Sequence, residues 1–423
     1  MDGLTEFYNK YKVKVLDFLS IFGPATITAM ADNDAAGVAT YAIAGALLGY
    51  PILFALFWIT ILLGITQEMG MRLSLVTRKG LADLIRENQG VQTALIIFIF
   101  LFIANMGGSI IVDVAAFKTT AEILRLPAIP LIVIMLLASF VFIVKGNYKL
   151  TQRIMLLSSL FYLAYIFSAF KSSPDWGLAL KNLAWPNGIS FTSAYWKNYI
   201  IIGLGVLGTT ITPWGQFFIS SFGLDKKISV EKLKYSQMET YWGAFATDFF
   251  SFFMIIATAA TLFVHHITLT NGTTASLAIE PFAGNLAAVL FALGIMNAGF
   301  MGIITVGLST TYAFSEFFGL TGSLDAPFEK SKLFYLLFIG QLVVAFIFVL
   351  FPVIDLFKIA VVAQLLNTFT LPPVFYYLIK YTSNKELMGK YVNSGLQKWS
   401  AIVGTLVISA ASLFAVAATI FHF

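Results

Sequence analysis

The 423-residue sequence contains no cysteine, only three histidines, and charged side chains at only 11% of its positions. The absence of cysteine excludes disulfides, thiolate metal ligands and thiol redox motifs. A soluble domain carries about a quarter charged residues, so a chain that is 59% hydrophobic cannot cover its surface with polar groups. The sequence also lacks a paired-histidine metalloprotease spacing, a serine–histidine arrangement and a nucleotide loop, so we expect neither an enzyme nor a cofactor.

Instead of polar surface, the sequence has long apolar segments along its whole length. A helix of about 20 apolar residues crosses a hydrocarbon core of about 30 Å. We therefore predict an all-α membrane protein with a single transmembrane domain over residues 1–423. Its eleven membrane helices are expected at about residues 16–48, 51–76, 94–121, 128–145, 153–171, 198–221, 240–265, 284–318, 333–352, 356–380 and 400–422.

Lysine and arginine indicate the orientation of these helices, because cytoplasmic loops are enriched in both. With the N-terminus in the cytoplasm, 20 of the 26 basic residues fall in cytoplasmic segments, whereas the loop with His265 and His266 has none. The pI of 9.1 thus follows from membrane topology and does not indicate a nucleic-acid partner. We predict a multi-pass protein of a prokaryotic plasma membrane, with the N-terminus inside, the C-terminus outside and no obligatory protein partner.

Three predicted spans carry residues that interrupt a helix. The first has the run Asp32–Asp34 at mid-span, the sixth has Pro213, and the tenth has Leu371–Pro373. Proline removes an amide donor and clashes with the preceding turn, so we expect these spans to kink or unwind. Broken helices five spans apart are typical of inverted five-helix repeats with a substrate site between them. The first repeat is expected at about 14–175, the inverted second repeat at about 195–382, and an extra helix at about 398–423.

The run Asp32, Asn33 and Asp34 is the strongest candidate for a cation site. An aspartate at the bilayer centre costs at least ~2.5 kcal/mol, so two of them in one broken span call for a function. Their carboxylates and the carbonyls freed by unwinding would supply oxygen ligands. A structural alternative is that one aspartate caps the half-helix that begins near Ala35. Consecutive helical residues do not share a face, so we expect only one carboxylate to point inward.

Polar side chains on other spans are weaker candidates. Threonine often bonds to its own backbone and glutamine can join helices, so such residues become ligands only by facing the first break. On the sixth span they are Thr209, Thr210, Thr212 and Gln216. On spans three, seven and ten, contact with the substrate and a structural role both remain open for Asp113, Asp248, Gln364 and Asn367.

Several motifs in this order resemble the Nramp family of divalent-metal transporters. They are GPA followed by DAAGVATY, then QEMGMRLSLVTRKGLADLIRE, ANMGGSIIVDVAAF, TTITP on the sixth span and a Q…LP pattern on the tenth. The long stretch after the second span is the most specific of these. The resemblance covers roughly residues 20–380 and implies the LeuT-type fold, which has the inverted repeats expected from the breaks.

The chain departs from the family's pattern at the ligand positions. The family's Asp-Pro-Gly-Asn signature aligns with the segment from Asp34 to Gly37, so the metal-binding aspartate is kept and the asparagine ligand is lost. The Met-Pro-His signature aligns with Thr212-Pro213-Trp214, which replaces a thioether by a hydroxyl. A second family histidine falls at Ile219, and an acidic residue associated with proton movement falls at Ala116.

These replacements favour a hard cation. Thioethers favour transition metals, whereas carboxylate, hydroxyl, carbonyl and water suit Mg²⁺, Ca²⁺ and Mn²⁺. Glycine at position 37 would leave room for water, which Mg²⁺ retains when one or two carboxylates bind it. The pattern resembles the Nramp-related magnesium transporter branch. The resemblance implies Asp34 as principal ligand, lined by Thr212, Gln364, Gly37 and the carbonyls of Ala31 and Thr209, with Asp32, Asn33 and Gln216 as second choices.

We expect Mg²⁺ uptake, with Mn²⁺ also carried, by alternating access and without proton coupling, because the titratable groups at the histidine and acidic positions are lost. One alternative is a proton-coupled Mn²⁺/Fe²⁺ importer in which Asp113 or Asp32 carries the proton. Another is a Na⁺-coupled organic-solute symporter, although two aspartates at the break would repel a substrate carboxylate. A transporter-like sensor is disfavoured by the short termini.

Overall fold

The computed structural model describes residues 22–189, 192–320, 322–324, 326, 328–351 and 355–420. The predicted start of the first span at 16–21 and the end of the last at 421–422 lie outside these residues, as do the first residues of the first repeat. In the described part of the chain all regular structure is helical, as expected.

The predicted membrane spans are confirmed. Ten helical segments among the described residues are long and apolar enough to cross a membrane, and Ala35–Leu48 forms a shorter apolar helix within the first span. The main helices of spans two to five are α4 (Ile52–Thr77), α5 (Leu81–Asn105), α6 (Ile111–Leu124), α7 (Ala128–Lys145), α8 (Tyr148–Ser158) and α9 (Leu163–Lys171). Those of the later spans are α11 (Ser193–Thr210), α12 (Pro213–Asp225), α13 (Leu233–Thr258), α16 (Ala287–Phe318), α17 (Lys332–Val349), α18 (Leu356–Thr382) and α20 (Gly395–Ile420).

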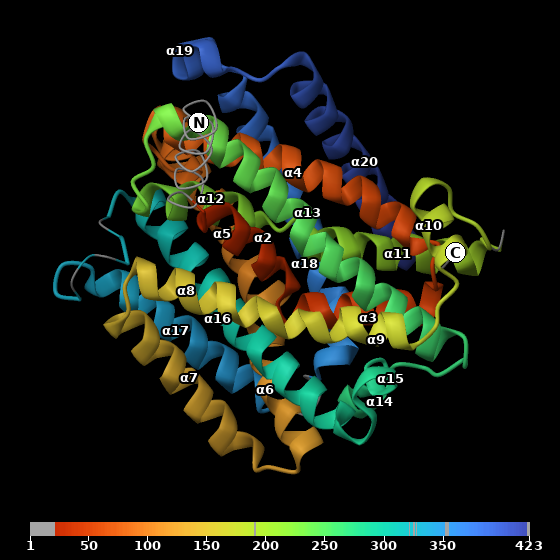
Figure 1. The fold of residues 1–423 in the computed structure, drawn as a ribbon. Coiled ribbons are helices and arrows are strands. Elements are labelled where there is room, and N and C mark those ends of the chain that lie inside the picture. Colours follow the sequence, from red (N-terminus) through yellow and green to blue (C-terminus); the bar gives the residue numbers. More distant parts are fainter. Residues whose placement is uncertain are drawn as a thin grey trace, which may run out of the picture.

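Short helices connect these spans at the two ends of the bundle. Figure 1 shows α19 (Lys385–Met388) at one end, and α10 (Trp176–Ala184), α14 (Gly272–Ser276) and α15 (Glu280–Ala283) at the other. Span three begins earlier than predicted, because α5 already starts at Leu81 and bends at Gly90. Gly90 has a φ of 82°, a left-handed conformation that glycine adopts without steric cost.

The first span is broken at the predicted position. It consists of α2 (Pro24–Met30), a short 3₁₀ turn η1 (Ala31–Asn33) and α3 (Ala35–Leu48), with extended backbone at Asp34. The Asp34 side chain accepts a hydrogen bond from the amide of Gly37, so it is the N-cap of α3. A carboxylate at this position satisfies one of the amides that a helix start leaves unpaired.

The sixth span is broken in the same way. α11 ends at Thr210, Ile211 and Thr212 are extended, and Pro213 is the first residue of α12. Proline is favoured there because a first-turn amide has no partner within the helix. The Thr212 hydroxyl caps α12 by accepting from the amide of Gly215.

The tenth span was expected to kink or unwind, and it does not unwind. α18 continues through Pro372 and Pro373 as one helix from Leu356 to Thr382. Two adjacent prolines remove only two amide donors, and their fixed φ of about −65° is itself helical. Packing of α18 against α11, α3, α5 and α20 supports the helix on several sides.

The broken spans lie inside the bundle. α2 packs on α13 and α12, and α3 packs on α13, α18 and α11. Outer helices such as α7 and α20 expose rows of large apolar side chains, among them Ile134, Leu137, Leu406 and Leu413. Apolar groups outside and polar groups inside are the arrangement that a lipid environment requires.

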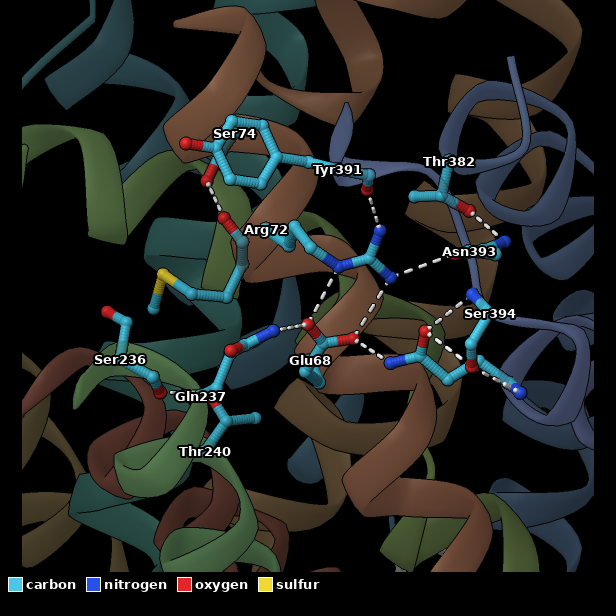
Figure 2. A network of polar contacts seen from close by, with 12 residues as sticks. Glu68, Arg72, Ser74, Ser236, Gln237, Thr240, Thr382, Tyr391, Asn393 and Ser394 are labelled. Atoms are coloured by element: carbon cyan, nitrogen blue, oxygen red, sulfur yellow. Dashed lines mark hydrogen bonds and ion pairs between the residues drawn. The ribbon is translucent and has the colours of Figure 1, made fainter. Parts of the chain in front are cut away.

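A polar network joins three helices near one end of the bundle (Figure 2). Glu68 and Arg72 of α4 form a two-bond ion pair, with distances of 2.7 Å from Nε to Oε1 and 3.0 Å from Nη2 to Oε2. Glu68 also accepts from Gln237 of α13 at 2.7 Å and from Gln397 of α20 at 2.8 Å. Arg72 donates to the Tyr391 carbonyl and to Asn393. Both charged side chains are at most 4% exposed, so each relies on the other for compensation.

The start of α2 is held to α13 by a second buried carboxylate. Glu239 accepts from the amides of Gly23 and Thr26 at 2.7 and 3.0 Å, and thereby caps α2 from outside the helix. Lys226 donates to the carbonyl of Phe22 beside it. Burial lowers the pKa of Lys226 to about 8, and Glu239 opposes this shift. The half-helix in front of the first break is therefore tied to its neighbours by charged groups.

Candidate ion site

The two breaks meet, and Asp32 is the residue that joins them. The Thr212 hydroxyl donates to Asp32 Oδ1 at 3.3 Å, and the Thr209 hydroxyl donates to the Asp32 carbonyl at 3.3 Å. These contacts connect η1 to the end of α11 and the start of α12. The structure thus places Asp32, Thr209 and Thr212 together, as predicted from the two interrupted spans.

Backbone carbonyls at the breaks differ in availability. The carbonyl of Thr209 would normally accept from the amide four residues later, but that residue is Pro213 and has no amide proton. The carbonyl of Ala31 accepts from the amide of Asp34 at 3.0 Å within the 3₁₀ turn. A carbonyl has two lone pairs, so both oxygens keep capacity for an ion, with Thr209 the less committed of the two.

Asp34 and Asp113 share the N-terminus of α3. Asp34 Oδ1 accepts from the amide of Gly37 at 2.7 Å, and Asp113 Oδ1, from α6, accepts from the amide of Ala35 at 3.0 Å. The capping alternative for Asp34 is therefore confirmed. A cap uses one of about four acceptor positions of a carboxylate and leaves the others for a cation. The ligand role of Asp34 remains a prediction.

Asp32 and Asp34 are both buried, so the expectation that only one carboxylate points inward is wrong. The break replaces regular helix by a 3₁₀ turn and extended backbone at Asp34, which lets the two side chains turn inward toward different partners. Asp32 faces the sixth span, whereas Asp34 faces α3 and α6. Asn33 lies between them and binds α13: its amide group donates to the Thr247 hydroxyl at 2.8 Å, and its oxygen accepts from Ser251 at 3.0 Å. In this conformation Asn33 fastens the break to α13.

Gly37 does not provide the open space that the sequence indicated. A Cβ at this position would lie 2.3 Å from the Asp32 carbonyl oxygen and 2.9 Å from the Thr209 hydroxyl. The break folds Asp32 back against the first turn of α3, so the backbone carbonyl of Asp32 occupies the space that a side chain at position 37 would need. The expectation of room for water beside Gly37 is wrong for this conformation, and glycine serves close approach instead.

Gln364 and Gln216 lie on the two sides of the sixth break. The backbone of Gln364 on α18 packs against Gly208, where an added Cβ would lie 2.1 Å from the Gln364 carbonyl oxygen. Its side-chain oxygen accepts from Asn367 at 2.6 Å. Gln216 on α12 is one turn after Thr212 on the same helix face, and both of its buried side-chain polar atoms lack a hydrogen-bond partner.

The candidate residues are closed off from both sides of the membrane. None of the eight residues Ala31, Asp32, Asn33, Asp34, Thr209, Thr212, Gln216 and Gln364 is more than 2% exposed. Among the described residues no group of three or more His, Cys, Asp or Glu side chains is arranged to hold a metal. An ion bound here would therefore be coordinated by a mixture of carboxylate, hydroxyl, amide and backbone oxygens.

The sequence left the roles of the other intramembrane aspartates open and gave no indication of Tyr162. Asp113 was a weak candidate, and only the packing of α6 brings it to the amide of Ala35 at the first break. Asp248, another weak candidate, is buried on α13 one residue after Thr247, which binds Asn33. Tyr162, which donates to the Asn33 carbonyl, carried no signal because an aromatic residue in an apolar span is ordinary. Intramembrane aspartates are rare enough that Asp113 and Asp248 could have been ranked higher on that ground.

Two discontinuous helices that meet at a buried polar site define a membrane transporter with the LeuT-type fold. A solved structure of the Eremococcus coleocola manganese transporter, in complex with an aromatic bis-isothiourea substituted compound, has the same fold. Its TM-score is 0.76 at 18% identity, with coverage of 95% of this chain and 87% of that one. The sequence profile of Nramp, described as natural resistance-associated macrophage protein-like, matches residues 25–418. The chain belongs to the Nramp family.

Relatives at higher identity are bacterial. The divalent metal cation transporter MntH of Pectobacterium carotovorum is 25% identical over 401 residues, which cover 92% of this chain and 91% of the relative. MntH of Yersinia pestis (strain Pestoides F) is 26% identical over 414 residues, with 92% of each covered. A Na⁺-coupled sialic acid symporter shares the fold at a TM-score of 0.60 and 13% identity, covering 94% of this chain and 89% of the other.

Proposed function

We propose that this chain transports divalent metal ions across a prokaryotic plasma membrane, with Mg²⁺ as preferred substrate and Mn²⁺ as a second. Membership of the Nramp family and the relatives named for divalent cations and manganese support the ion class. The observation that carries the choice of Mg²⁺ is the contact of the Thr212 hydroxyl with Asp32 at the sixth break. Every candidate metal-ligand atom at the two breaks is an oxygen, and oxygen ligands suit hard cations.

Alternating access would proceed by movement of the half-helices around the buried site. Both halves of the first span pack on α13, but α2 also packs on α12, whereas α3 also packs on α18 and α11. Movement of one half relative to the other would open Asp34 and Asp32 to one side at a time. An inside-negative membrane potential attracts a cation inward and would make the net direction uptake.

The membrane potential supplies enough driving force for uptake without protons. Each charge that crosses gains ~2.3 kcal/mol per 100 mV, so an ion with two charges gains ~4.6 kcal/mol. The positions that carry a histidine and an acidic side chain in the family pattern are Ile219 and Ala116 here. We propose that transport is not coupled to protons.

Proteoliposomes that contain a Mg²⁺ dye and a pH dye test this proposal. With an inside-negative potential, we expect Mg²⁺ to enter without acidification of the lumen. Entry of Mn²⁺ but not Mg²⁺, with acidification in proportion to the metal flux, would instead show the proton-coupled alternative. A Na⁺-coupled solute symporter is the alternative that the fold shared with the sialic acid symporter offers. The buried Asp32, Asp34 and Asp113 at the first break would repel an anionic substrate.

The ligand at position 212 provides a test of ion selectivity. We expect Thr212→Met to raise the affinity for Cd²⁺ or Mn²⁺ relative to Mg²⁺ by about tenfold, which is ~1.4 kcal/mol, because a thioether favours softer ions. The matched control is Thr212→Leu, which loses the same α12 cap and has a similar size without sulfur. Competition of each metal against Mg²⁺ uptake measures the ratio. Equal selectivity of the Met and Leu variants would show that residue 212 does not contact the ion.

A further inference from the structure

The backbone carbonyl of Phe22, which directly precedes the N-cap residue of α2, accepts hydrogen bonds from two side chains that are distant in sequence. Lys226 Nζ donates to it from the end of α12, and the Gln152 side-chain amide donates at 2.7 Å from α8. The Lys226 ammonium group also donates to Gln152 Oε1 at 3.5 Å. A bond from an ammonium group is charge-assisted and therefore stronger than a neutral one. The entry into α2 is thus fixed to two other spans.

Glu239 of α13 supplies the cap that α2 does not provide for itself. Gly23 is the N-cap residue, and a glycine has no side chain that could accept from the first amides. Instead, Glu239 Oε1 accepts from the amides of Gly23 and Thr26 at 2.7 and 3.0 Å, and the Glu239 side chain is fully buried. A cap stabilises the first turn of a helix because it satisfies amides that have no partner within the helix. α2 therefore keeps its cap only while it stays next to α13.

α2 connects the candidate ion site to the end of the bundle that we expect to face the cytoplasm. Its seven residues are all buried, and η1 with Asp32 follows directly at its C-terminus. The 3₁₀ turn and the extended backbone at Asp34 separate α2 from α3, so α2 can move as a short rigid unit. A movement of α2 away from α12 and α13 would open the site at this end. The same movement would break the two bonds to the Phe22 carbonyl and the two bonds to Glu239.

We propose that Lys226 and Glu239 are positioning residues of a gate on the cytoplasmic side: they hold α2 in the closed position, and the ion site opens to that side only when both release it. Neither residue is a candidate ligand of the ion. Contacts of this kind are either made or broken, so the gate has two discrete states, and Lys226 and Glu239 set the equilibrium between them. The inference deepens the proposed function and rests on it only for alternating access.

The chain offers a direct probe of this movement because it contains no cysteine. Thr28→Cys places a single thiol on α2, and Thr40→Cys places one on α3. Both threonines are 0% exposed, and each hydroxyl donates at 2.7 Å to the carbonyl four residues earlier in its own helix, which is that of Pro24 or Ala36. The two positions are thus matched in environment, but only position 28 should become accessible when α2 moves.

We expect Glu239→Gln and Lys226→Met each to raise the rate at which a membrane-impermeant maleimide labels Thr28→Cys from the cytoplasmic side by about tenfold. The reason is that loss of a charge-assisted bond shifts the gate toward its open state. Labelling of Thr40→Cys should not change. Inside-out vesicles from cells that produce the full-length chain give the cytoplasmic rate, and right-side-out vesicles give the outer rate. The matched control Lys227→Met removes the neighbouring, exposed lysine and should leave both rates unchanged.

Two results would overturn the inference. One is a cytoplasmic labelling rate of Thr28→Cys that neither substitution raises in the folded protein. The other is an equal rise for Thr40→Cys, which would mean that Lys226 and Glu239 stabilise the whole fold and do not act on α2 alone. The labelling needs no transported ion, so the outcomes are separate from failure of the proposed function. A rise confined to position 28 without Mg²⁺ uptake refutes the transport proposal alone, whereas Mg²⁺ uptake with unchanged labelling refutes the gate alone.

Discussion

Replacing Asp34 by asparagine is expected to reduce Mg²⁺ uptake by more than about 100-fold while leaving the stability of the fold nearly unchanged. Mutation of a residue that only hydrogen-bonds a metal ligand lowers metal affinity or activity by about 10–100-fold. Removal of the charged principal ligand itself should lower uptake by more. Asparagine is as good an N-cap as aspartate, so the bond to the Gly37 amide would survive. The measurement is uptake into proteoliposomes, with thermal unfolding in detergent alongside it.

Asp34→Ala separates the two roles of this side chain. Alanine removes both the charge and the cap, and loss of a cap costs about 0.5–2 kcal/mol. We therefore expect the alanine variant to lose uptake like the asparagine variant and, in addition, to unfold at a lower temperature. Uptake by Asp34→Asn at the rate of the unaltered chain would mean that Asp34 is a cap and that the transported ion binds elsewhere.

Arg72→Met is expected to destabilise the protein by about 3–5 kcal/mol, because it leaves the buried Glu68 carboxylate without its charged partner. Gln237 and Gln397 would still donate to Glu68, but neutral donors do not replace a charge. Loss of the bonds from Arg72 to the Tyr391 carbonyl and Asn393 also loosens the start of α20. Unfolding of the purified protein in mixed micelles with increasing denaturing detergent measures the change.

Two controls identify burial of the charge as the cause. The double variant Glu68→Gln/Arg72→Met removes both charges and should recover most of the lost stability, as replacement of a whole buried pair often does. Lys79→Met breaks the ion pair with Glu87, whose side chains are 45% and 37% exposed, and should change stability by no more than about 1 kcal/mol. A double variant as unstable as Arg72→Met would contradict this explanation.

Much of the fold follows from local properties of the sequence. The spans are visible because a helix in lipid must be apolar over about 20 residues. The breaks are visible because Pro213 lacks an amide proton and Asp34 is a good cap, and both effects act within a few residues. The prolines of α18 show the limit of this reasoning. The same local rule predicted a kink or unwinding, and α18, which packs against several helices, does not unwind.

The candidate site was predictable in part. The sequence predicted Asp32, Asp34 and Thr212 as ligands, and the structure brings Asp32 and Thr212 together where the two breaks meet. Their role as ligands stays a prediction. The sequence could not show that the Asp32 carbonyl occupies the space beside Gly37, or that Asn33 binds α13. These are contacts made by side chains and backbone that approach only when the helices pack.

By itself, the sequence determined that this is a helical membrane protein, where its first and sixth helices break, and which intramembrane residues carry charge. Each of these depends on the hydropathy or backbone chemistry of neighbouring residues. Only the tertiary structure decided which partners each polar side chain meets: Asp113 reaches α3 from α6, Asn33 reaches Thr247 of α13, and Gln397 reaches Glu68 across 329 positions of sequence. The direction of a side chain depends on how distant helices pack, and no local pattern encodes that.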